Sequence, residues 1–473
     1  MRTPLLPVDV LAGWGTDGAD PRERLRSLAA RPEVAEALWL ASPELTARWQ
    51  ENTTTEGPLD RVERAVAAYL IRAATRPTPF GLFAGVGVGR LTGRDTALHV
   101  PPLSSLQRRS RLDMGVLAAE ADRVECDAGS TDGLLFSPNT SLYRAAGRVR
   151  FVEARMTGTV RSHHLVAVDE DDALTATLRR AVGGARLEDL AAELVDDDIT
   201  VEDARHYVHE LVDARMLVSD AQPAVTGTGD PAAALCAALH RSPATAPVAE
   251  RFDTVRAHLA ALDRDGLGQP VSRYTTIVRD MRELVPDLDP ARLVQVDLVK
   301  PSTGMTLSHR VVDELARAVA LLHRITAWRP DPMQEFRTAF DTRYGGAEVG
   351  LAQVLDEETG IGYHGSAHPD AEESPLLAGI DLGLGSEHAR TWSRRDGVLL
   401  ELLTDALSRG AECIDLADAD IQRLAEPDPL PVPDALSIMA IVLGDPQTGQ
   451  RERIGLSQLL DVGVGEIDAF RAS

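Results

Sequence analysis

The chain has 473 residues, a length that suggests two to four domains, and 44% of its residues are apolar, which is enough to bury a core. The formal net charge of −24 argues against a general nucleic-acid binder, which would normally be basic. It leaves room for a local basic patch, although each such run also fits a solvated mixed-charge face. The candidates for that patch are Arg108, Arg109 and Arg111, and then Arg144, Arg148, Arg150 and Arg155.

Two further features of the composition bear on the class of protein. The sequence has no run of about 18 apolar residues and no signal peptide at its start, so we expect a cytoplasmic protein without a membrane span. Its three cysteines are far apart and predict neither a disulfide framework nor a zinc site. The only lysine is Lys300.

Residues 1–132 are expected to form an N-terminal α/β part. Its most distinctive stretch holds Pro77 and Pro79, which fix φ near −65° and disfavour helix at the residues before them. We expect a stiff corner that presents the guanidinium of Arg76 and the hydroxyl of Thr78 in fixed directions, and a plain turn ending a helix is the alternative. The periodicity predicts helices at 21–30, 32–50, 58–76 and 106–123, the last carrying Arg111 and Asp113, and a strand at 82–91.

Residues 133–223 have a different pattern, with a hairpin near 142–152 and a returning strand at 216–218. Strands combined with three short helices are typical of a winged-helix-like unit. The third helix is too acidic to read a DNA major groove, which favours capture of an extended peptide at a free strand edge. The three helices are expected at 171–182, 186–194 and 201–214, and Thr200 with Asp203 approximates a capping box before the third.

Residues 231–473 form the third part and are predicted to be mixed α/β. The alternation at 292–300 predicts a strand in which Asp297 faces away from its apolar neighbours. A turn-strand-turn passage is expected at 348–362, an exposed loop at 364–374 and a short strand at 412–416. Three consecutive carboxylates (Asp356, Glu357 and Glu358) are more often solvated than metal-bound, so no metal site is predicted. The fold class is therefore α+β, with several subdomains and a peptide-recognition module.

Several passages, taken in order, resemble one known family, and they span roughly residues 1–440. These passages are 2–7, 72–86, 111–113, 141–144, 294–297, 343–345 and 355–362. They resemble the N-terminal domain of lantibiotic dehydratases, the LanB-type family that modifies ribosomally made peptides. The resemblance implies that glutamate is taken from glutamyl-tRNA and esterified to a Ser or Thr of a precursor peptide. It also implies that the leader of this peptide binds as an added strand, and that a separate elimination domain later expels the glutamate.

The resemblance also assigns roles to residues. Arg76 and Thr78 are expected to line the site for the 3′ end of the tRNA, with Arg2, Asp113 and Asp297 nearby. Either aspartate is expected to hold the ammonium of the glutamyl group or to orient an arginine, and a role as base is a further reading. The leader-peptide residues are expected to be Tyr143, Arg148, Arg150 and Phe151. No cofactor is expected beyond glutamyl-tRNA as co-substrate.

The sequence departs from the family pattern near its end. The family's glutamylation domain continues for several hundred residues, with a later Gly-rich, Arg-containing segment, and 450–473 does not resemble that continuation. We therefore expect a transferase component that needs a second dehydratase or elimination subunit. Half of a split enzyme, a truncated gene product and a leader-binding remnant all fit. The alternative functions are a non-catalytic leader-peptide-binding protein and a peptide aminoacyl-tRNA ligase.

Overall fold

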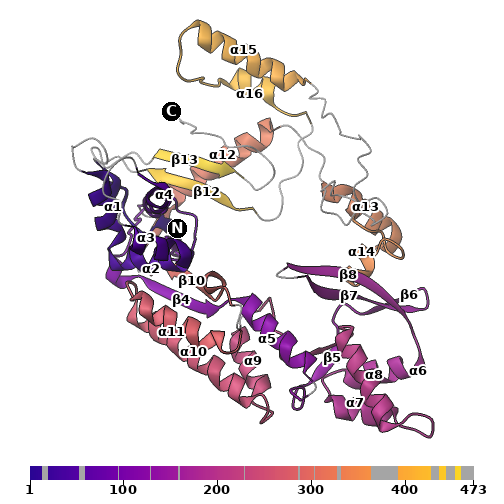
Figure 1. The fold of residues 1–473 in the computed structure, drawn as a ribbon. Helices are drawn as coiled ribbons and strands as arrows, with labels where there is room; N and C mark the ends of the chain where they lie inside the picture. The colour runs from indigo at the N-terminus through magenta and orange to yellow at the C-terminus, as the bar shows by residue number, and fades with distance from the viewer. Residues whose placement is uncertain are drawn as a thin grey trace. The chain divides into compact units, whose positions relative to one another are not determined.

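The computed structural model forms two compact units, and Figure 1 shows their helices and strands. The first unit combines residues 1–89, 99–304 and 348–360, and the second combines 90–98, 305–347 and 361–473. Among the described residues, no helix is both long and apolar enough to cross a membrane. The structure describes residues 1–12, 20–52, 59–93, 95–127, 129–157, 160–227, 229–285, 288–302, 304–326, 332–363, 392–427, 436–443 and 453–459.

A four-stranded sheet organises the N-terminal part of the first unit. Its order is β1-β2-β10-β4, in which β2 and β10 run parallel while β1 and β4 are antiparallel to their neighbours. The strands are β1 (Arg2–Pro4), β2 (Ala84–Val86), β4 (Gln107–Leu112) and β10 (Val294–Val299), and helices α1 (Pro21–Ala29), α2 (Pro32–Ala41), α3 (Pro43–Glu51) and α4 (Arg61–Thr75) accompany them, with 3-10 turns η1 (Val8–Leu11), η2 (Leu103–Ser105) and η3 (Pro290–Arg292).

One face of this sheet is packed on an apolar core. Val296 and Leu298 of β10 and Phe83 before β2 are buried in one hydrophobic cluster with Val66 and Leu70 of α4. Because side chains alternate along a strand, the residues between them must point to the other face. The sheet therefore has one packed face and one open face.

Lys300 follows β10 on the packed side and is only 1% exposed. Its ammonium donates a hydrogen bond to the carbonyl of Pro4, and its backbone N–H donates to Val86 O at 2.7 Å. Burial lowers the pKa of Lys300 to about 8. The only lysine in the sequence is thus an internal group that ties β1 to β10.

Helix α4 confirms the predicted helix and ends at the predicted corner. A capping box starts it, since the Asp60 carboxylate accepts from the Glu63 N–H at 2.8 Å and the Glu63 carboxylate accepts from the Asp60 N–H at 2.9 Å. The helix stops at Thr75, and Arg76 is already extended with φ −99° and ψ 117°. Gly81 takes φ +51°, a conformation that favours glycine.

The prediction of one helix over 106–123 was wrong in its first half. Residues Gln107–Leu112 form β4, and helix α5 (Met114–Cys126) begins only after Asp113, whose carboxylate caps it. Arg108 points into the core, where it pairs with Glu36 of α2 and its Nε lies 3.3 Å from Asp263. The sequence pattern predicted a helix through these residues, whereas alternate burial along a strand separates Arg108 from Arg109 and Arg111.

The middle segment contains the predicted hairpin and all three predicted helices. The hairpin turn has Ala146 at φ 52° and Gly147 at φ 76°, the left-handed pair that a tight two-residue turn requires. The strands lie in two separate small sheets, β5–β9 and β6–β7–β8, and the winged-helix description stays a prediction. The elements are β5 (Phe136–Pro138), β6 (Tyr143–Ala145), β7 (Arg148–Thr157), β8 (Val160–Asp169), β9 (Leu217–Ser219), α6 (Asp172–Ala181), α7 (Leu187–Leu194) and α8 (Val201–Asp213).

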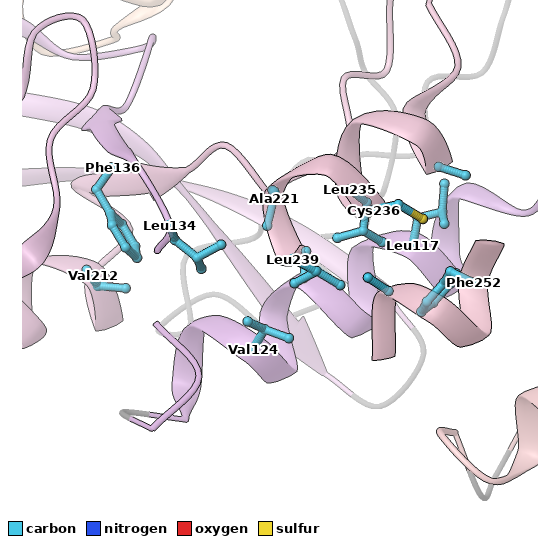
Figure 2. Packing of buried hydrophobic residues seen from close by; sticks show 14 of the residues in the cluster. Leu117, Val124, Leu134, Phe136, Val212, Ala221, Leu235, Cys236, Leu239 and Phe252 are labelled. Atoms are coloured by element: carbon cyan, nitrogen blue, oxygen red, sulfur yellow. The ribbon is translucent and has the colours of Figure 1, made fainter. Parts of the chain in front are cut away.

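A second apolar cluster joins this segment to a group of helices. Figure 2 shows Leu117 and Val124 of α5 beside Leu235 and Leu239 of α9, with Phe252 of α10 closing the group. Burying such side chains contributes about 2 kcal/mol each, so α5 is anchored along its length. The helices that follow it are α9 (Pro231–Leu239), α10 (Ala246–Asp265) and α11 (Val271–Arg282), and the short α14 (Leu351–Leu355) lies in the same unit.

Three further predictions of strands were wrong, and the remaining elements lie in the second unit. The strand expected at 82–91 is two strands, because the glycines between them separate β2 from β3, which pairs with β11 here. Helix α14 replaces the strand expected within 348–362, and 412–416 has no strand. The exposed loop predicted at 364–374 lies outside the described residues. The elements are β3 (Arg90–Thr92), β11 (Thr306–Ser308), α12 (His309–Ile325), α13 (Pro332–Tyr344), α15 (Arg394–Ser408), α16 (Asp418–Leu424), β12 (Ile438–Leu443) and β13 (Arg453–Leu459).

Candidate functional site

The open face of the four-stranded sheet is strongly polar. Strand register places Asp297 of β10 opposite Arg109 of β4, and Gln295 opposite Arg111. Arg2 lies on the same face, because it pairs with Val86 in the row that continues through Val299. Arg2 lies two strand spacings across the sheet and two residues along it from Asp297. The distance between their backbones is therefore on the order of 12 Å. This face therefore gathers charged residues from three strands that are far apart in the sequence.

Two side-chain contacts cross between β4 and β10 on this face. The guanidinium of Arg111 forms an ion pair with Asp297, on the diagonal rather than with the residue directly opposite. The Gln295 amide donates a 2.6 Å hydrogen bond to Oδ2 of Asp113, whose Oδ1 accepts from the Gly115 N–H at 2.8 Å. Both predicted carboxylates are thus held in place by partners from the neighbouring strand or helix.

The corner lies at the same end of the sheet as Asp113. It immediately precedes β2, and β2 runs parallel to β10, so the corner and the start of β10 share one end. Strand β4 is antiparallel and finishes there, which brings Asp113 to that end as well. The topology therefore brings Arg76, Thr78 and Asp113 to one end of the sheet, while Asp297 lies within β10, opposite Arg109.

Arg76 and Thr78 are exposed, and in the described ranges neither side chain has a hydrogen-bond or ion-pair partner. The corner itself is rigid. Phe80 stacks on Phe83 with ring centroids 6.0 Å apart, and the guanidinium of Arg72 lies 4.6 Å from the Phe80 centroid. The two polar groups therefore project from a segment that these ring contacts hold against the fold.

The arginines of the site fall into two kinds. Arg2 and Arg109 are exposed and, like Arg76, have no side-chain partner in the part of the chain that the structure describes. Arg111 instead has a carboxylate partner. Unpaired guanidiniums suit phosphate groups, whereas a carboxylate beside a guanidinium also attracts an ammonium. Over the described residues, no three His, Cys, Asp or Glu side chains gather as a metal ion would need.

Three of the four expected leader-peptide residues are engaged inside the first unit. Phe151 is 1% exposed in the helical core, and the Tyr143 hydroxyl donates to Oδ2 of Asp356 at 2.6 Å. Arg150 lies 3.1 Å from the same oxygen and 2.7 Å from Glu358. The fourth, Arg148, forms an exposed ion pair with Asp169 at 2.9 Å.

Asp356 is the centre of that buried group. Burial alone would raise the pKa of its carboxyl, but hydrogen bonds donated by Thr359 and Tyr143 outweigh the burial and lower the pKa to about 2. The carboxylate also accepts from the Glu358 N–H at 2.8 Å. Two of the three consecutive carboxylates in the sequence therefore serve as partners of Arg150, which spacing alone does not reveal.

The middle segment offers a free strand edge for an extended peptide. Strand β8 pairs only with β7 among the described strands, over ten residues. The opposite side of β7 is partly occupied, since Asn139 donates to Val152 O at 3.1 Å and the Val152 N–H donates to Ser141 Oγ at 2.9 Å. Leu165 of β8 is 44% exposed. The edge of β8 is therefore the open place for an added strand.

Sequence reasoning missed Arg109, Arg111 and Gln295 as members of one site. The strand period at 292–300 was readable, and it placed Asp297 on the outer face. The register between β4 and β10 was not readable, because about 180 residues separate the two strands. Only the register shows which arginine meets which carboxylate.

Comparisons with known proteins all point to one family. Residues 30–449 match the family model described as "Lantibiotic dehydratase, N terminus". The subtilin biosynthesis protein SpaB of Bacillus subtilis is 24% identical over 307 residues, which cover 63% of this chain and 28% of SpaB. The chain thus spans about a quarter of that relative's length.

Two solved structures share the fold. The tRNA-dependent lantibiotic dehydratase MibB from Microbispora sp. 107891 matches with a TM-score of 0.71 and 24% identity, over 97% of this chain and 43% of MibB. The glutamylation domain TbtB from thiomuracin biosynthesis, bound to 5′-phosphodesmethylglutamycin, matches with a TM-score of 0.53 and 18% identity, over 92% of this chain and 54% of TbtB.

Proposed function

The chain belongs to the lantibiotic dehydratase family, as its N-terminal part, and on that premise we propose that it transfers glutamate from glutamyl-tRNA to Ser or Thr of a ribosomally made precursor peptide. One observation carries the proposal. The corner with Arg76 and Thr78 shares one end of the sheet with Asp113, and Asp297 lies on the open face of the same sheet, which also bears unpaired arginines.

The chemistry is an ester exchange. The Ser or Thr hydroxyl oxygen bonds to the carbonyl carbon of the glutamyl ester, and the bond from that carbon to the tRNA 3′ oxygen breaks. The proton lost by the peptide hydroxyl ends on the ribose hydroxyl that leaves. No external oxidant or energy source is needed, so the protein must mainly hold two substrates together and stabilise the oxyanion.

The proposed roles follow from charge and exposure. Arg76, Arg2 and Arg109 are free to contact the phosphates at the acceptor end, and the Thr78 hydroxyl can bond a phosphate or ribose oxygen. Asp297 attracts the ammonium of the glutamyl group. Both oxygens of Asp113 already accept hydrogen bonds, from Gln295 and Gly115, so its role is to fix the end of β4 beside the corner.

We propose that the leader of the precursor peptide adds as a strand to the edge of β8. Main-chain hydrogen bonds supply affinity in this mode and alternate side chains supply selectivity. Tyr143, Arg150 and Phe151 then act indirectly, by fixing the β6–β7 hairpin on which β8 is built. Arg148 is exposed and near the end of β8, where its partner Asp169 lies.

We propose that a partner chain, a second dehydratase or elimination subunit, supplies elimination of glutamate. The support is that MibB and TbtB are about twice as long as the part this chain matches. The reaction is tested by incubating the chain with precursor peptide, tRNA, glutamate and glutamyl-tRNA synthetase, with and without any dehydratase chain that proves to be encoded next to it. A glutamyl mass increase on Ser or Thr is expected.

A second function is favoured by one observation. The β8 edge is open and is built without any residue of the corner, so leader binding does not depend on transfer. Peptide binding with no mass increase under every combination of partner chains would make the protein a leader-peptide-binding subunit. Transfer of another amino acid to the peptide's C-terminus would instead make it a peptide aminoacyl-tRNA ligase.

A further inference from the structure

We propose that the exposed face of helix α4 is the docking surface for the double-stranded acceptor stem of the tRNA, and that Arg61 and Arg64 hold phosphates of that stem. Helix α4 runs directly into the corner, so a ligand that extends back along the helix from the corner meets these two arginines. This inference rests on the proposed function and deepens it, because it names a surface for the tRNA away from its reacting end.

The exposed face of α4 is cationic. Positions three or four residues apart in a helix lie on one face, and five such positions are all exposed in α4. They are Arg61, Arg64, Ala68, Ile71 and Thr75. The only carboxylate of the helix, Glu63, lies on the buried side with Val66 and Leu70. The outer face of α4 therefore carries two guanidiniums and no anion.

Neither of these two guanidiniums is neutralised from within the described part of the chain, where Arg61 and Arg64 have no side-chain hydrogen bond or ion pair. The two carboxylates next to them in sequence are engaged elsewhere. The Asp60 carboxylate accepts from the Glu63 N–H at 2.8 Å and from the Asn52 amide at 2.9 Å. Glu63 is buried in an ion pair with Arg22. Both arginines are thus available to an external anion.

The stability of α4 does not explain this placement. Arg61 lies in the first turn, where the helix dipole is positive and disfavours a cation. Arg72 is different, because it lies in the last turn, where the dipole favours a cation, and its guanidinium contacts the Phe80 ring. Arg72 therefore has a structural role, whereas Arg61 and Arg64 are better explained by a ligand.

The length and charge of the face fit a nucleic-acid stem. A rise of about 1.5 Å per residue places Arg61 and Arg64 on the order of 20 Å before the corner, along the axis of a helix that its capping box and buried face hold in place. The single-stranded 3′ end of a tRNA is short, so a tRNA that reaches the corner also brings its stem into this range. Proteins recognise double-stranded RNA largely through its phosphates and its shape.

The charge of the whole chain sharpens the argument. With a formal net charge of −24, most of the surface repels a polyanion. A face that has exposed guanidiniums and no carboxylate is therefore where a phosphate backbone can approach, and the planar fork of arginine suits phosphate oxygens. An acidic segment of the precursor peptide would satisfy the same charges, and the experiment separates it from RNA.

The experiment measures binding to the full-length chain by fluorescence anisotropy. The probe is a labelled RNA hairpin that carries the acceptor stem of tRNA for glutamate with its single-stranded 3′ end, and labelled precursor peptide is measured beside it. The test variants are the double variants Arg61→Gln with Arg64→Gln, and Arg61→Lys with Arg64→Lys.

A matched control removes the same charge from other helices of the first unit. Arg179 of α6 and Arg282 of α11 are exposed, and neither has a side-chain partner among the residues that the structure describes. The double variant Arg179→Gln with Arg282→Gln therefore has the same net charge as the glutamine variant of α4. Thermal melts check that each variant is folded, which we expect because all four arginines are exposed.

We expect the α4 glutamine variant to bind the hairpin at least tenfold more weakly at low salt. The slope of log Kd against log salt concentration should fall by about two, because two phosphate contacts are lost. The lysine variant should keep most of the affinity, and the control variant should stay within about twofold of the wild type. In the transfer assay, the α4 glutamine variant should raise KM for glutamyl-tRNA and leave kcat nearly unchanged.

Four results would overturn the inference. They are no hairpin binding by the wild type, an unchanged affinity and salt slope in the α4 glutamine variant, an equal loss in the control variant, and a loss of precursor-peptide affinity with unchanged hairpin affinity, which would assign the face to the peptide. The proposed reaction is judged separately. Glutamylation with an unchanged KM for glutamyl-tRNA in the α4 glutamine variant removes only the docking surface, and hairpin binding that depends on α4 without any glutamylation removes only the reaction.

Discussion

The hydroxyl of Tyr143 donates a 2.6 Å hydrogen bond to Oδ2 of Asp356, although the two residues lie 213 positions apart in the sequence. Asp356 also forms an ion pair with Arg150 and accepts a hydrogen bond from the backbone N–H of Glu358. This carboxylate therefore fastens the 348–360 segment to the β6–β7 hairpin. The 355–362 passage, one of those that resemble the family, therefore contributes by holding the hairpin in place.

Replacing Asp356 with Asn should lower the free energy of unfolding of the first unit by about 3 kcal/mol, because it leaves the buried Arg150 short of an anion. Tyr143→Phe should cost about 1 kcal/mol, the contribution of one hydrogen bond. Arg148→Gln is the matched control, since its exposed pair contributes little. Urea unfolding followed by circular dichroism measures all three, and equal values for Asp356→Asn and Arg148→Gln would contradict the assignment.

Acid should weaken the same contact. The pKa of Asp356 is about 2 in the folded chain against 3.8 ordinarily, so the unfolded state takes up the proton first as the pH falls. The stability that Asp356 contributes is therefore complete above pH 4 and is lost as the pH falls toward 2. Unfolding curves at several pH values should show a shallower acid loss for Asp356→Asn than for the wild type.

Lys300 should also make the stability rise with pH, but in the alkaline range and because burial disfavours its charged form. Its folded pKa of about 8 lies below the ordinary 10.5, so between these values the unfolded state binds more protons and the stability of the wild type rises with pH. Lys300→Met removes this dependence, and the difference between variant and wild type should change by about 3 kcal/mol over the interval. Parallel stability curves from pH 7 to 10.5 would show that Lys300 is not buried as a charged group.

Arg76→Ala should abolish glutamylation and leave leader-peptide binding unchanged, because the guanidinium is exposed and its corner leads into a different sheet from that of β8. A mass-spectrometric transfer assay and a fluorescence-anisotropy binding assay with labelled leader peptide give the two readouts. If leader binding fell together with transfer, the corner would have a structural role that its exposure does not suggest.

A pair of proline variants tests the β8 edge. Successive backbone N–H groups of a strand point to opposite sides, so of His164→Pro and Leu165→Pro one removes a hydrogen bond to β7 and the other removes a donor from the free edge. We expect one variant to lower the melting temperature and the other to lose leader affinity at least tenfold with an unchanged melt. Full leader affinity in both variants would place the peptide elsewhere.

The sequence predicts correctly those features that depend on residues close together in the chain, and it fails where a feature depends on distant residues. The capping box of α8, the stop of α4 before Pro77 and the turn at Gly147 depend on neighbours a few positions apart, and the sequence predicts them correctly. β4 was taken for a helix because its burial depends on Glu36 and Asp263, which only the fold brings to Arg108.

The candidate site likewise has some features that local sequence predicts and others that only the fold reveals. The rigid corner and the outward direction of Asp297 could be read from prolines and from strand alternation. The Arg111–Asp297 and Gln295–Asp113 contacts depend on the register of strands about 180 residues apart, which no local pattern encodes. The engagement of Arg150 with Glu358 was hidden for the same reason.

The burial of Lys300 has a consequence for the surface as a whole. Because Lys300 is the only lysine, every exposed cationic side chain other than histidine is a guanidinium, whose charge does not change at any pH at which the protein is folded. Amine-directed reagents should therefore label this chain almost exclusively at its α-amino group, which donates to Gly87 O at 2.7 Å beside the end of β2. A single fluorophore attached there would report on the sheet that carries the site without altering any of its arginines.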